Sequence, residues 1–113
     1  MTLIPMTAVC ESIEPWEVTK GLLIIGRDAQ IDKQPVSWRH LNDEKVSRRH
    51  VALLYTNSIW LLVDLASTNG VFVRTEQDSN WKRVGTDRLQ NPLELEDGWL
   101  LRVGKTVFKV QIG

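Results

Sequence analysis

The sequence has little cysteine, no long apolar run and no net charge, and each shortage removes a class of protein. Its single cysteine, Cys10, has no partner for a disulfide and cannot build a cysteine-based metal site. The longest apolar runs, Val51–Tyr55 and Ile59–Val63, are five residues each, whereas a membrane helix needs about 18 or more. The first fifteen residues contain no Lys or Arg, so a secretory signal is not expected. We expect a protein of a reducing compartment, with no membrane span and no metal.

Charge and composition narrow the choice further. Fourteen basic residues balance fourteen acidic ones, whereas nucleic-acid-binding domains are usually strongly basic, with a pI above about 9. The length of 113 residues fits one domain, 1–113, that is large enough to bury a core. Val, Ile and Thr number 27 against four Ala, and these β-branched residues suit strands better than helices. The composition therefore predicts one mostly β domain.

Short apolar segments separated by turn residues recur along the chain, and no segment keeps a helical spacing for three turns. The dipeptides Asn69-Gly70 and Gly104-Lys105 predict tight hairpin turns. The polar stretch Arg74–Gln90 predicts an extra hairpin, Gly21–Ile25 a central strand and Ser37–Leu41 an edge strand. This pattern is typical of an all-β sandwich or barrel, and of the two we expect a two-sheet antiparallel β-sandwich. The predicted strands cover residues 6–12, 16–18, 21–25, 37–41, 51–55, 59–64, 71–73, 99–103 and 106–112.

Three polar clusters fall in the predicted loops: Gly26-Arg27, Ser47-Arg48-Arg49-His50 and Ser67-Thr68-Asn69-Gly70. The planar guanidinium of arginine presents a fork of donors that matches phosphate oxygens. Serine and threonine hydroxyls add short hydrogen bonds, and an asparagine amide can pair with a passing peptide backbone. The residue types predict an anion pocket beside a clamp for a peptide main chain, as in the recognition of phosphorylated motifs by arginine clusters.

The order and spacing of these clusters resemble the forkhead-associated (FHA) domain over residues 21–112. The resemblance implies a sandwich of about eleven strands, with recognition loops at one end that bind phosphothreonine peptides in extended form. The segments that carry it are Gly26-Arg27, Ser47-x-x-His50, Ser67-Thr68-Asn69-Gly70-x-Phe72, Leu95-Glu96-Asp97-Gly98 and Val103-Gly104.

The resemblance also implies a role for each residue that matches the motif. Arg27 and Ser47 would hold the phosphate, with Arg48 as a third ligand. Thr68 and Asn69 would lie under the phosphothreonine and bind the peptide main chain. No catalytic residue, metal or cofactor is implied.

Three further residues would shape the loops rather than contact the ligand. Gly26 and His50 would be structural, with His50 bracing the loop that presents Ser47. Gly70 would complete the turn that begins at Asn69.

An enzyme is the first alternative, with Ser47, His50 and Asp64 as a hydrolytic set. The sequence has no Gly-x-Ser-x-Gly elbow, and a serine and a histidine three residues apart seldom form a nucleophile–base pair. A nucleic-acid surface is the second alternative, and the zero net charge argues against it. Its cations would be Arg39, Arg48, Arg49, Lys82 and Arg83.

A third alternative is a scaffold of the same fold that forms homodimers without phosphate through an exposed Trp38 or Trp81. Trp60 is expected in the core, and Cys10 is expected to be a small buried residue. By its resemblance the chain is similar to the N-terminal module of a signalling or DNA-damage-response adaptor. The nucleus is then the expected location, with the cytoplasm as the alternative. The expected partner is a phosphothreonine protein, with homodimerisation as an addition and no direct nucleic-acid or membrane contact.

Overall fold

The computed structural model describes residues 1–7, 14–18, 21–27, 37–86 and 89–113, and all the regular structure in them is β. Within these ranges no helix is long and apolar enough to cross a membrane. The eleven strands are β1 (Thr2–Thr7), β2 (Trp16–Glu17), β3 (Leu22–Gly26), β4 (Ser37–His40), β5 (Val51–Thr56), β6 (Ile59–Asp64), β7 (Val71–Arg74), β8 (Lys82–Arg83), β9 (Leu93–Glu94), β10 (Leu100–Val103) and β11 (Thr106–Gln111).

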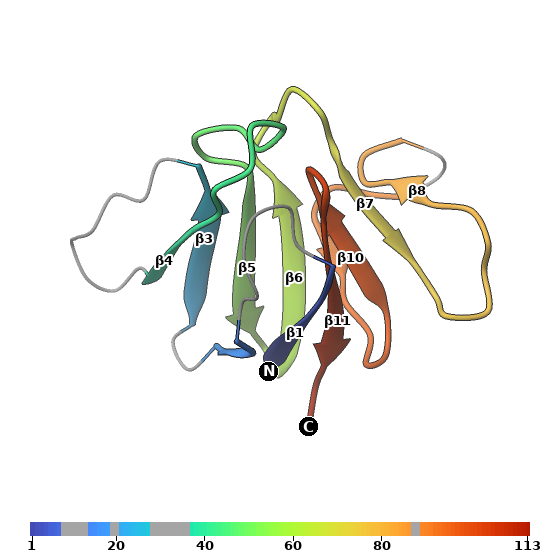
Figure 1. The fold of residues 1–113 in the computed structure, drawn as a ribbon. Helices are drawn as coiled ribbons and strands as arrows, with labels where there is room; N and C mark the ends of the chain where they lie inside the picture. The colour runs from blue at the N-terminus through green and yellow to red at the C-terminus, as the bar shows by residue number, and fades with distance from the viewer. Residues whose placement is uncertain (8–13, 19–20, 28–36, 87–88) are drawn as a thin grey trace.

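The strands form two mostly antiparallel sheets that enclose one core (Figure 1). Sheet A has six strands in the order β2-β1-β11-β10-β7-β8, and sheet B has five in the order β4-β3-β5-β6-β9. The predicted all-β sandwich of about eleven strands is confirmed. The pair β3–β4 departs from the antiparallel rule, because β4 runs parallel to β3.

Alternating side chains fill the space between the sheets. In β11, Phe108 and Val110 are fully buried, while Lys109 between them is partly exposed, as the period-two geometry of a strand requires. Trp60 is 7% exposed, so its predicted place in the core is confirmed. The ring of Trp16 lies 5.1 Å from that of Phe108 and extends the core toward the β2 edge. Burial of these apolar side chains is the main force that holds the two sheets together.

Several predicted elements occur as expected. The β10–β11 turn is Gly104-Lys105, with a φ of +63° at Gly104. The extra hairpin predicted in the stretch 74–90 is found only in part: the stretch contributes one strand, β8, and its partner β7 is paired through Phe72 and Val73, which precede the stretch. Strand β3 is interior and β4 lies at the edge of sheet B.

The first strand lies earlier than predicted. It spans Thr2–Thr7 rather than 6–12, and residues 8–13 are outside the described part of the chain. A proline inside a strand normally argues against that strand. Here β2 pairs with Thr2 and Leu3, so Pro5 stands beyond the part of β1 that has neighbours on both sides. Cys10 falls outside the described residues.

The predicted hairpin around Asn69-Gly70 is wrong in its pairing. Strand β6 belongs to sheet B and β7 to sheet A, so the segment between them crosses from one sheet to the other. Both sides of β6 are occupied, by β5 and β9. The turn chemistry remains, with a φ of +83° at Gly70. The crossing places residues 65–70 at one end of the sandwich.

The two ends of the sandwich differ in what they carry. The β4–β5 and β6–β7 loops meet at one end, beside the end of β3, and both chain termini lie at the other (Figure 1).

Candidate functional site

Backbone hydrogen bonds tie the end of β3 to the loops on either side of it. The N–H of Arg27 donates to the carbonyl oxygen of Ser47 at 2.9 Å, and the N–H of His50 donates to the carbonyl of Ile25 at 3.0 Å. The N–H of Leu41 donates to the carbonyl of Gly26 at 2.9 Å. The first two polar clusters, separated by twenty residues in sequence, are therefore held side by side.

Gly26 lets the β4–β5 loop approach β3. A Cβ atom at this position would overlap the carbonyl oxygen of Arg48 and would lie 2.7 Å from its carbonyl carbon and 3.1 Å from Cα of Arg49. The contacts are with backbone atoms, which cannot rotate away as a flexible side chain can. The glycine is thus required by the closeness of two chain segments.

His50 joins the two recognition loops. Its side chain is fully buried. Nδ1 accepts a hydrogen bond from the N–H of Ser47 at 2.9 Å, and Nε2 lies 2.7 Å from the carbonyl oxygen of Gly70. Because a carbonyl can only accept, Nε2 carries a proton. Because Nδ1 accepts a hydrogen bond, it carries none, and the ring is the neutral tautomer protonated at Nε2. His50 therefore fixes the loop that presents Ser47 against the turn that ends at Gly70.

Ser47 and the β6–β7 loop are in direct contact. The N–H of Thr68 donates to Oγ of Ser47 at 3.1 Å, which leaves the hydroxyl hydrogen of Ser47 available for another acceptor. Nδ2 of Asn69 donates to the carbonyl of Lys45 at 2.8 Å. Arg27, Thr68 and Asn69 are exposed. The end of the sandwich that carries the loops thus has a cation (Arg27), a hydroxyl donor (Ser47) and an amide (Asn69) on one surface.

The backbone of the β6–β7 loop is fixed before any ligand binds. Oγ of the buried Ser67 accepts from the N–H of Gly70 at 3.1 Å, and the N–H of Ser67 donates to Oδ1 of Asp64 at 3.0 Å. Ala66 has a φ of +57°, a conformation that costs a non-glycine residue about 1–2 kcal/mol. A loop ordered in advance loses less entropy when it binds.

Asp43 is a structural residue of the site that sequence reasoning missed. It is 2% exposed. Its Oδ2 accepts from the N–H of Lys105 at 2.7 Å and from Oγ1 of Thr106 at 3.4 Å, and its Oδ1 accepts from the N–H of Lys45 at 2.9 Å. A Cβ at Gly104 would lie 2.6 Å from Oδ2. The carboxylate therefore anchors the β4–β5 loop to the β10–β11 turn, 62 residues away.

Replacement of Asp43 by alanine is expected to destabilise the domain by about 3 kcal/mol, because buried donors lose a charged acceptor. Urea unfolding followed by tryptophan fluorescence measures the change. Asp97→Ala is the matched control: the Asp97 carboxylate accepts one exposed hydrogen bond, from the N–H of Ile112 at 2.8 Å, and its loss is expected to cost less than about 1 kcal/mol. Equal effects of the two substitutions would contradict the anchoring role of Asp43.

The hydrolytic alternative does not fit the geometry. Both ring nitrogens of His50 are engaged, with the backbone of Ser47 and of Gly70, so neither is the base for Oγ of Ser47. The carboxylate of Asp64 accepts from the backbone of Ser67. Among the described residues, no group of three or more His, Cys, Asp or Glu side chains is arranged to hold a metal ion.

The cations of the nucleic-acid alternative lie on different faces. Arg39 is in sheet B, with its guanidinium 5.5 Å from the ring of Trp16, whereas Lys82 and Arg83 form β8 at the edge of sheet A. Arg48 and Arg49 are exposed in the β4–β5 loop. Of the two tryptophans expected at the surface, Trp81 is half-buried, and the side chain of Trp38 is outside the described part of the chain.

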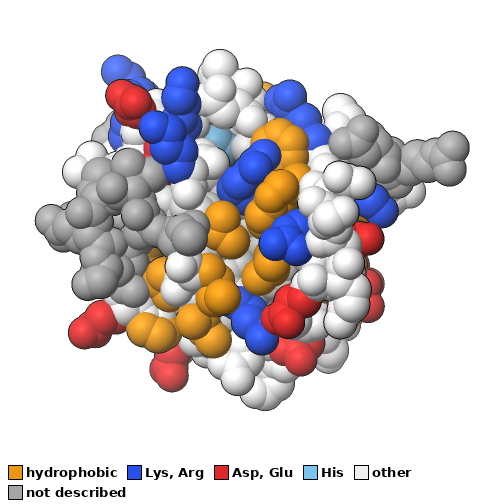
Figure 2. Space-filling model, turned by 45° about the vertical axis from the view of Figure 1, so that its right-hand side comes forward, with side chains coloured by type: hydrophobic (Ala, Val, Ile, Leu, Met, Phe, Trp, Pro, Cys, Tyr) orange, Lys and Arg blue, Asp and Glu red, His pale blue; other side chains and the backbone are white. Residues whose placement is uncertain are grey.

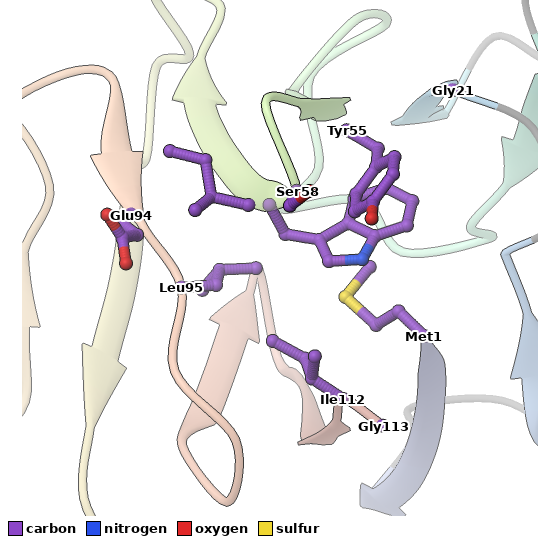
Figure 3. Close-up of a pocket in the computed structure, with 10 residues that line it drawn as sticks. Met1, Gly21, Tyr55, Ser58, Glu94, Leu95, Ile112 and Gly113 are labelled. Carbon is purple, nitrogen blue, oxygen red and sulfur yellow. The ribbon is translucent and has the colours of Figure 1, made fainter.

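A cavity of about 470 Å³ lies at the opposite end of the sandwich, between the termini (Figure 3). The ring centroids of Tyr55 and Trp60, which line it, are 5.0 Å apart. The thioether of Met1 points into the same space, while the carboxylate of Glu94 stands to one side (Figure 3). No Lys, Arg or His is among its described lining residues. With no cation described in its lining and a carboxylate at its edge, it does not suit a phosphate.

A family model described as the FHA domain matches residues 23–104 of the chain. No protein of curated function matches the sequence significantly. Twenty-three chains of solved structures match it.

Three of these structures illustrate the range of similarity. One from a structural and functional analysis of phosphothreonine-dependent FHA domain interactions is 27% identical, with a TM-score of 0.67 over 99% of this chain and 95% of that one. The FhaA FHA domain complexed with the intracellular domain of Rv3910 is 28% identical, with a TM-score of 0.63 over 95% and 94%. Mycobacterium tuberculosis EmbR in complex with a low-affinity phosphopeptide is 23% identical, with a TM-score of 0.71 over 99% of this chain and 24% of that one, which supports the fold alone.

Proposed function

The chain belongs to the forkhead-associated (FHA) domain family, and we propose that it recognises proteins phosphorylated on threonine and catalyses no reaction. FHA domains bind phosphothreonine peptides in protein–protein interactions. The observation that carries the proposal is the junction made by His50, whose two hydrogen bonds hold Ser47 and the Thr68–Gly70 turn against each other beside Arg27.

The phosphate is bound by donors on the β3 end and the β4–β5 loop. The guanidinium of Arg27 and the hydroxyl of Ser47 donate to its oxygens, and Arg48 adds a second cation. Charge-assisted hydrogen bonds of this kind contribute about 1.5–3 kcal/mol each. Ordering of an extended peptide offsets part of the gain. The expected affinity is about micromolar, or about −8 kcal/mol.

The peptide main chain is held by Asn69. One N–H of its amide is already committed to the carbonyl of Lys45, which fixes the orientation of the side chain. The rest of the amide then meets the peptide backbone as both donor and acceptor. Thr68, whose N–H is held by Ser47, lies under the phosphothreonine.

Fluorescence anisotropy with a degenerate phosphothreonine peptide library tests the proposal. We expect saturable, about micromolar binding of the phosphothreonine library and none of the unphosphorylated library, because the main-chain contacts alone do not offset the ordering cost. A phosphoserine library of the same design measures the preference for threonine. Equal binding of the phosphorylated and unphosphorylated libraries would contradict the proposal.

The resemblance to damage-response adaptors supports a finer proposal, that the domain acts in DNA-damage or checkpoint signalling in the nucleus and forms homodimers. A tagged chain followed before and after DNA damage tests the location and the pathway. Sedimentation velocity tests the dimer: a sedimentation coefficient that does not change with concentration over the micromolar range would count against it.

A further inference from the structure

The outer face of sheet A carries arginine and aromatic side chains next to the recognition loops. Cross-strand register aligns Arg83 of β8 with Phe72 of β7, and Phe72 with Arg102 of β10. Neighbours of Phe72 along β7, Val71 and Val73, point into the core and are at most 3% exposed. Phe72 therefore faces outward, and the three aligned residues form a row across the outside of the sheet.

Aromatic rings hold the guanidinium groups of this face. Arg102 lies 4.3 Å from the ring centroid of Phe72 and 5.0 Å from that of Trp81. Arg74 lies 4.9 Å from the ring of Trp81. Such cation–π contacts orient an arginine without neutralising it. We call Phe72, Arg74, Trp81, Arg83 and Arg102 the basic–aromatic patch.

Figure 2 turns the side of the molecule that carries sheet A toward the reader. Lys and Arg side chains lie among a band of hydrophobic side chains at the centre of this face, whereas Asp and Glu side chains stand around its margin (Figure 2). The centre of the face is thus basic and apolar although the whole chain has no net charge.

The patch is continuous with the phosphopeptide site. A Cβ built on Gly70 would lie 2.6 Å from Nε and 3.0 Å from Cζ of Arg83. Arg83 therefore passes directly over the residue that follows Asn69. A peptide chain that leaves Asn69 on this side meets Arg83 next, and Arg102 about 10 Å further on, two strand spacings away.

The acidic residue that follows β7 in sequence pairs with a cation outside the patch. Glu76, which follows β7, forms a 2.7 Å ion pair with Lys109, and this hydrogen bond raises the pKa of the Lys109 ammonium. Glu76 is thereby committed to a cation outside the patch. Arg74 already donates from Nη1 to the backbone carbonyls of Thr75 and Asp78, so the inference concerns Arg83 and Arg102. Carboxylates and phosphates match the planar fork of a guanidinium group.

We propose that the basic–aromatic patch binds an acidic segment of the same target, within about six residues of the phosphothreonine. This inference rests on the proposed function. An extended segment advances about 3.3 Å per residue, so about three residues span the distance from Arg83 to Arg102. The ligand groups are the carboxylates of Asp and Glu, and a second phosphate serves as the comparison in the test below.

A set of matched peptides tests the inference. The first is a short phosphothreonine peptide with neutral flanks, and the others add three Asp residues on the N-terminal side, three on the C-terminal side, or a second phosphothreonine at either place. We expect one of the two directions to raise the affinity about tenfold, since each exposed charge pair contributes a factor of about 1.5 to 5. The gain should shrink between 50 mM and 500 mM salt, because exposed pairs are screened.

Substitutions within the basic–aromatic patch test whether the gain in affinity comes from that patch. Arg83→Gln combined with Arg102→Gln is expected to reduce the tenfold gain to less than about twofold, while the affinity for the short peptide stays within about twofold. Arg83→Lys combined with Arg102→Lys keeps the charge and should retain part of the gain. Arg39→Gln is the matched control, because it removes an exposed arginine that also lies over a tryptophan, but from sheet B. It should leave the gain unchanged.

The outcomes separate the two proposals. If the short phosphopeptide does not bind at all, the proposed function fails. If it binds and no acidic extension improves the affinity, or if the Arg39 control loses as much of the gain as the double variant, the inference about the patch fails alone. If single-stranded DNA binds the patch more tightly than the acidic extensions do, the patch serves nucleic acid and the inference is overturned.

Discussion

Replacement of Arg27 by alanine is expected to weaken binding of a phosphothreonine peptide from about micromolar to about millimolar. Arg27 lies at the end of β3, where its backbone N–H is hydrogen-bonded to Ser47, and in the proposed complex its guanidinium would meet the dianionic phosphate directly. Truncating one partner of such a charge pair costs about 2–5 kcal/mol. Isothermal titration with one optimised peptide measures the loss.

The same substitution should leave the stability of the domain almost unchanged, because the Arg27 side chain is exposed in the free protein. Equal urea midpoints for Arg27→Ala and the unsubstituted chain would show that the lost binding is local. Arg39→Ala removes a second exposed arginine and is expected to bind within about twofold of the unsubstituted chain. Retained affinity in Arg27→Ala would refute the assignment of the phosphate pocket.

Replacement of Gly26 by alanine is expected to destabilise the domain by about 3 kcal/mol or more. The added methyl group would overlap the backbone carbonyl of Arg48, so β3 and the β4–β5 loop must move apart. Overpacking of this kind costs typically about 1–3 kcal/mol, and here the contacts are with backbone that cannot change rotamer. The displaced loop carries Ser47 and Arg48, so the remaining folded protein should also bind phosphopeptide more weakly.

Gly21→Ala is the matched control for this prediction. Gly21 precedes the same strand, β3. The atom nearest to a Cβ added at Gly21 is the carbonyl oxygen of Tyr55, at 4.0 Å, which is an ordinary van der Waals contact. The free energy of unfolding of the Gly21→Ala variant should differ from that of the unsubstituted chain by less than about 1 kcal/mol, in either direction. Chemical denaturation of both variants, followed by titration with phosphopeptide, measures the difference. Similar urea midpoints would contradict the close-packing role of Gly26.

Much of the fold could be predicted from local sequence, because each strand alternates in polarity and ends at turn residues. Strand β11 follows this rule closely, since one of its faces meets the core, whereas β5 and β6 were found as the two longest apolar runs. Long-range pairing was harder to predict. The dipeptide Asn69-Gly70 indicates a tight turn but does not tell whether the flanking strands pair with each other, and here they belong to different sheets. Strand β1 was misplaced because its position is set by its pairing with β11 rather than by its own composition.

The candidate site was partly predictable for a similar reason. Side chains that would face the ligand are polar residues in loops, and Arg27, Ser47 and Asn69 are conspicuous there. The supporting contacts were not predictable, because they join residues far apart in sequence. In the sequence, Asp43 resembles any solvated acid in a loop, and its burial depends on the β10–β11 turn that follows 62 residues later. The approach of Arg83 to Gly70 depends in the same way on the pairing of β8 with β7.

The position of both termini at the end away from the loops has a practical consequence (Figure 1). Met1 and Gly113 line the same cavity, so a tether attached at either end leaves the molecule from the same side. A biosensor chip or bead coupled through one terminus would present every copy with its binding loops facing solution. A domain with the proposed function would thereby be suited to oriented capture of phosphorylated proteins, since coupling through a terminus leaves the loops uncovered.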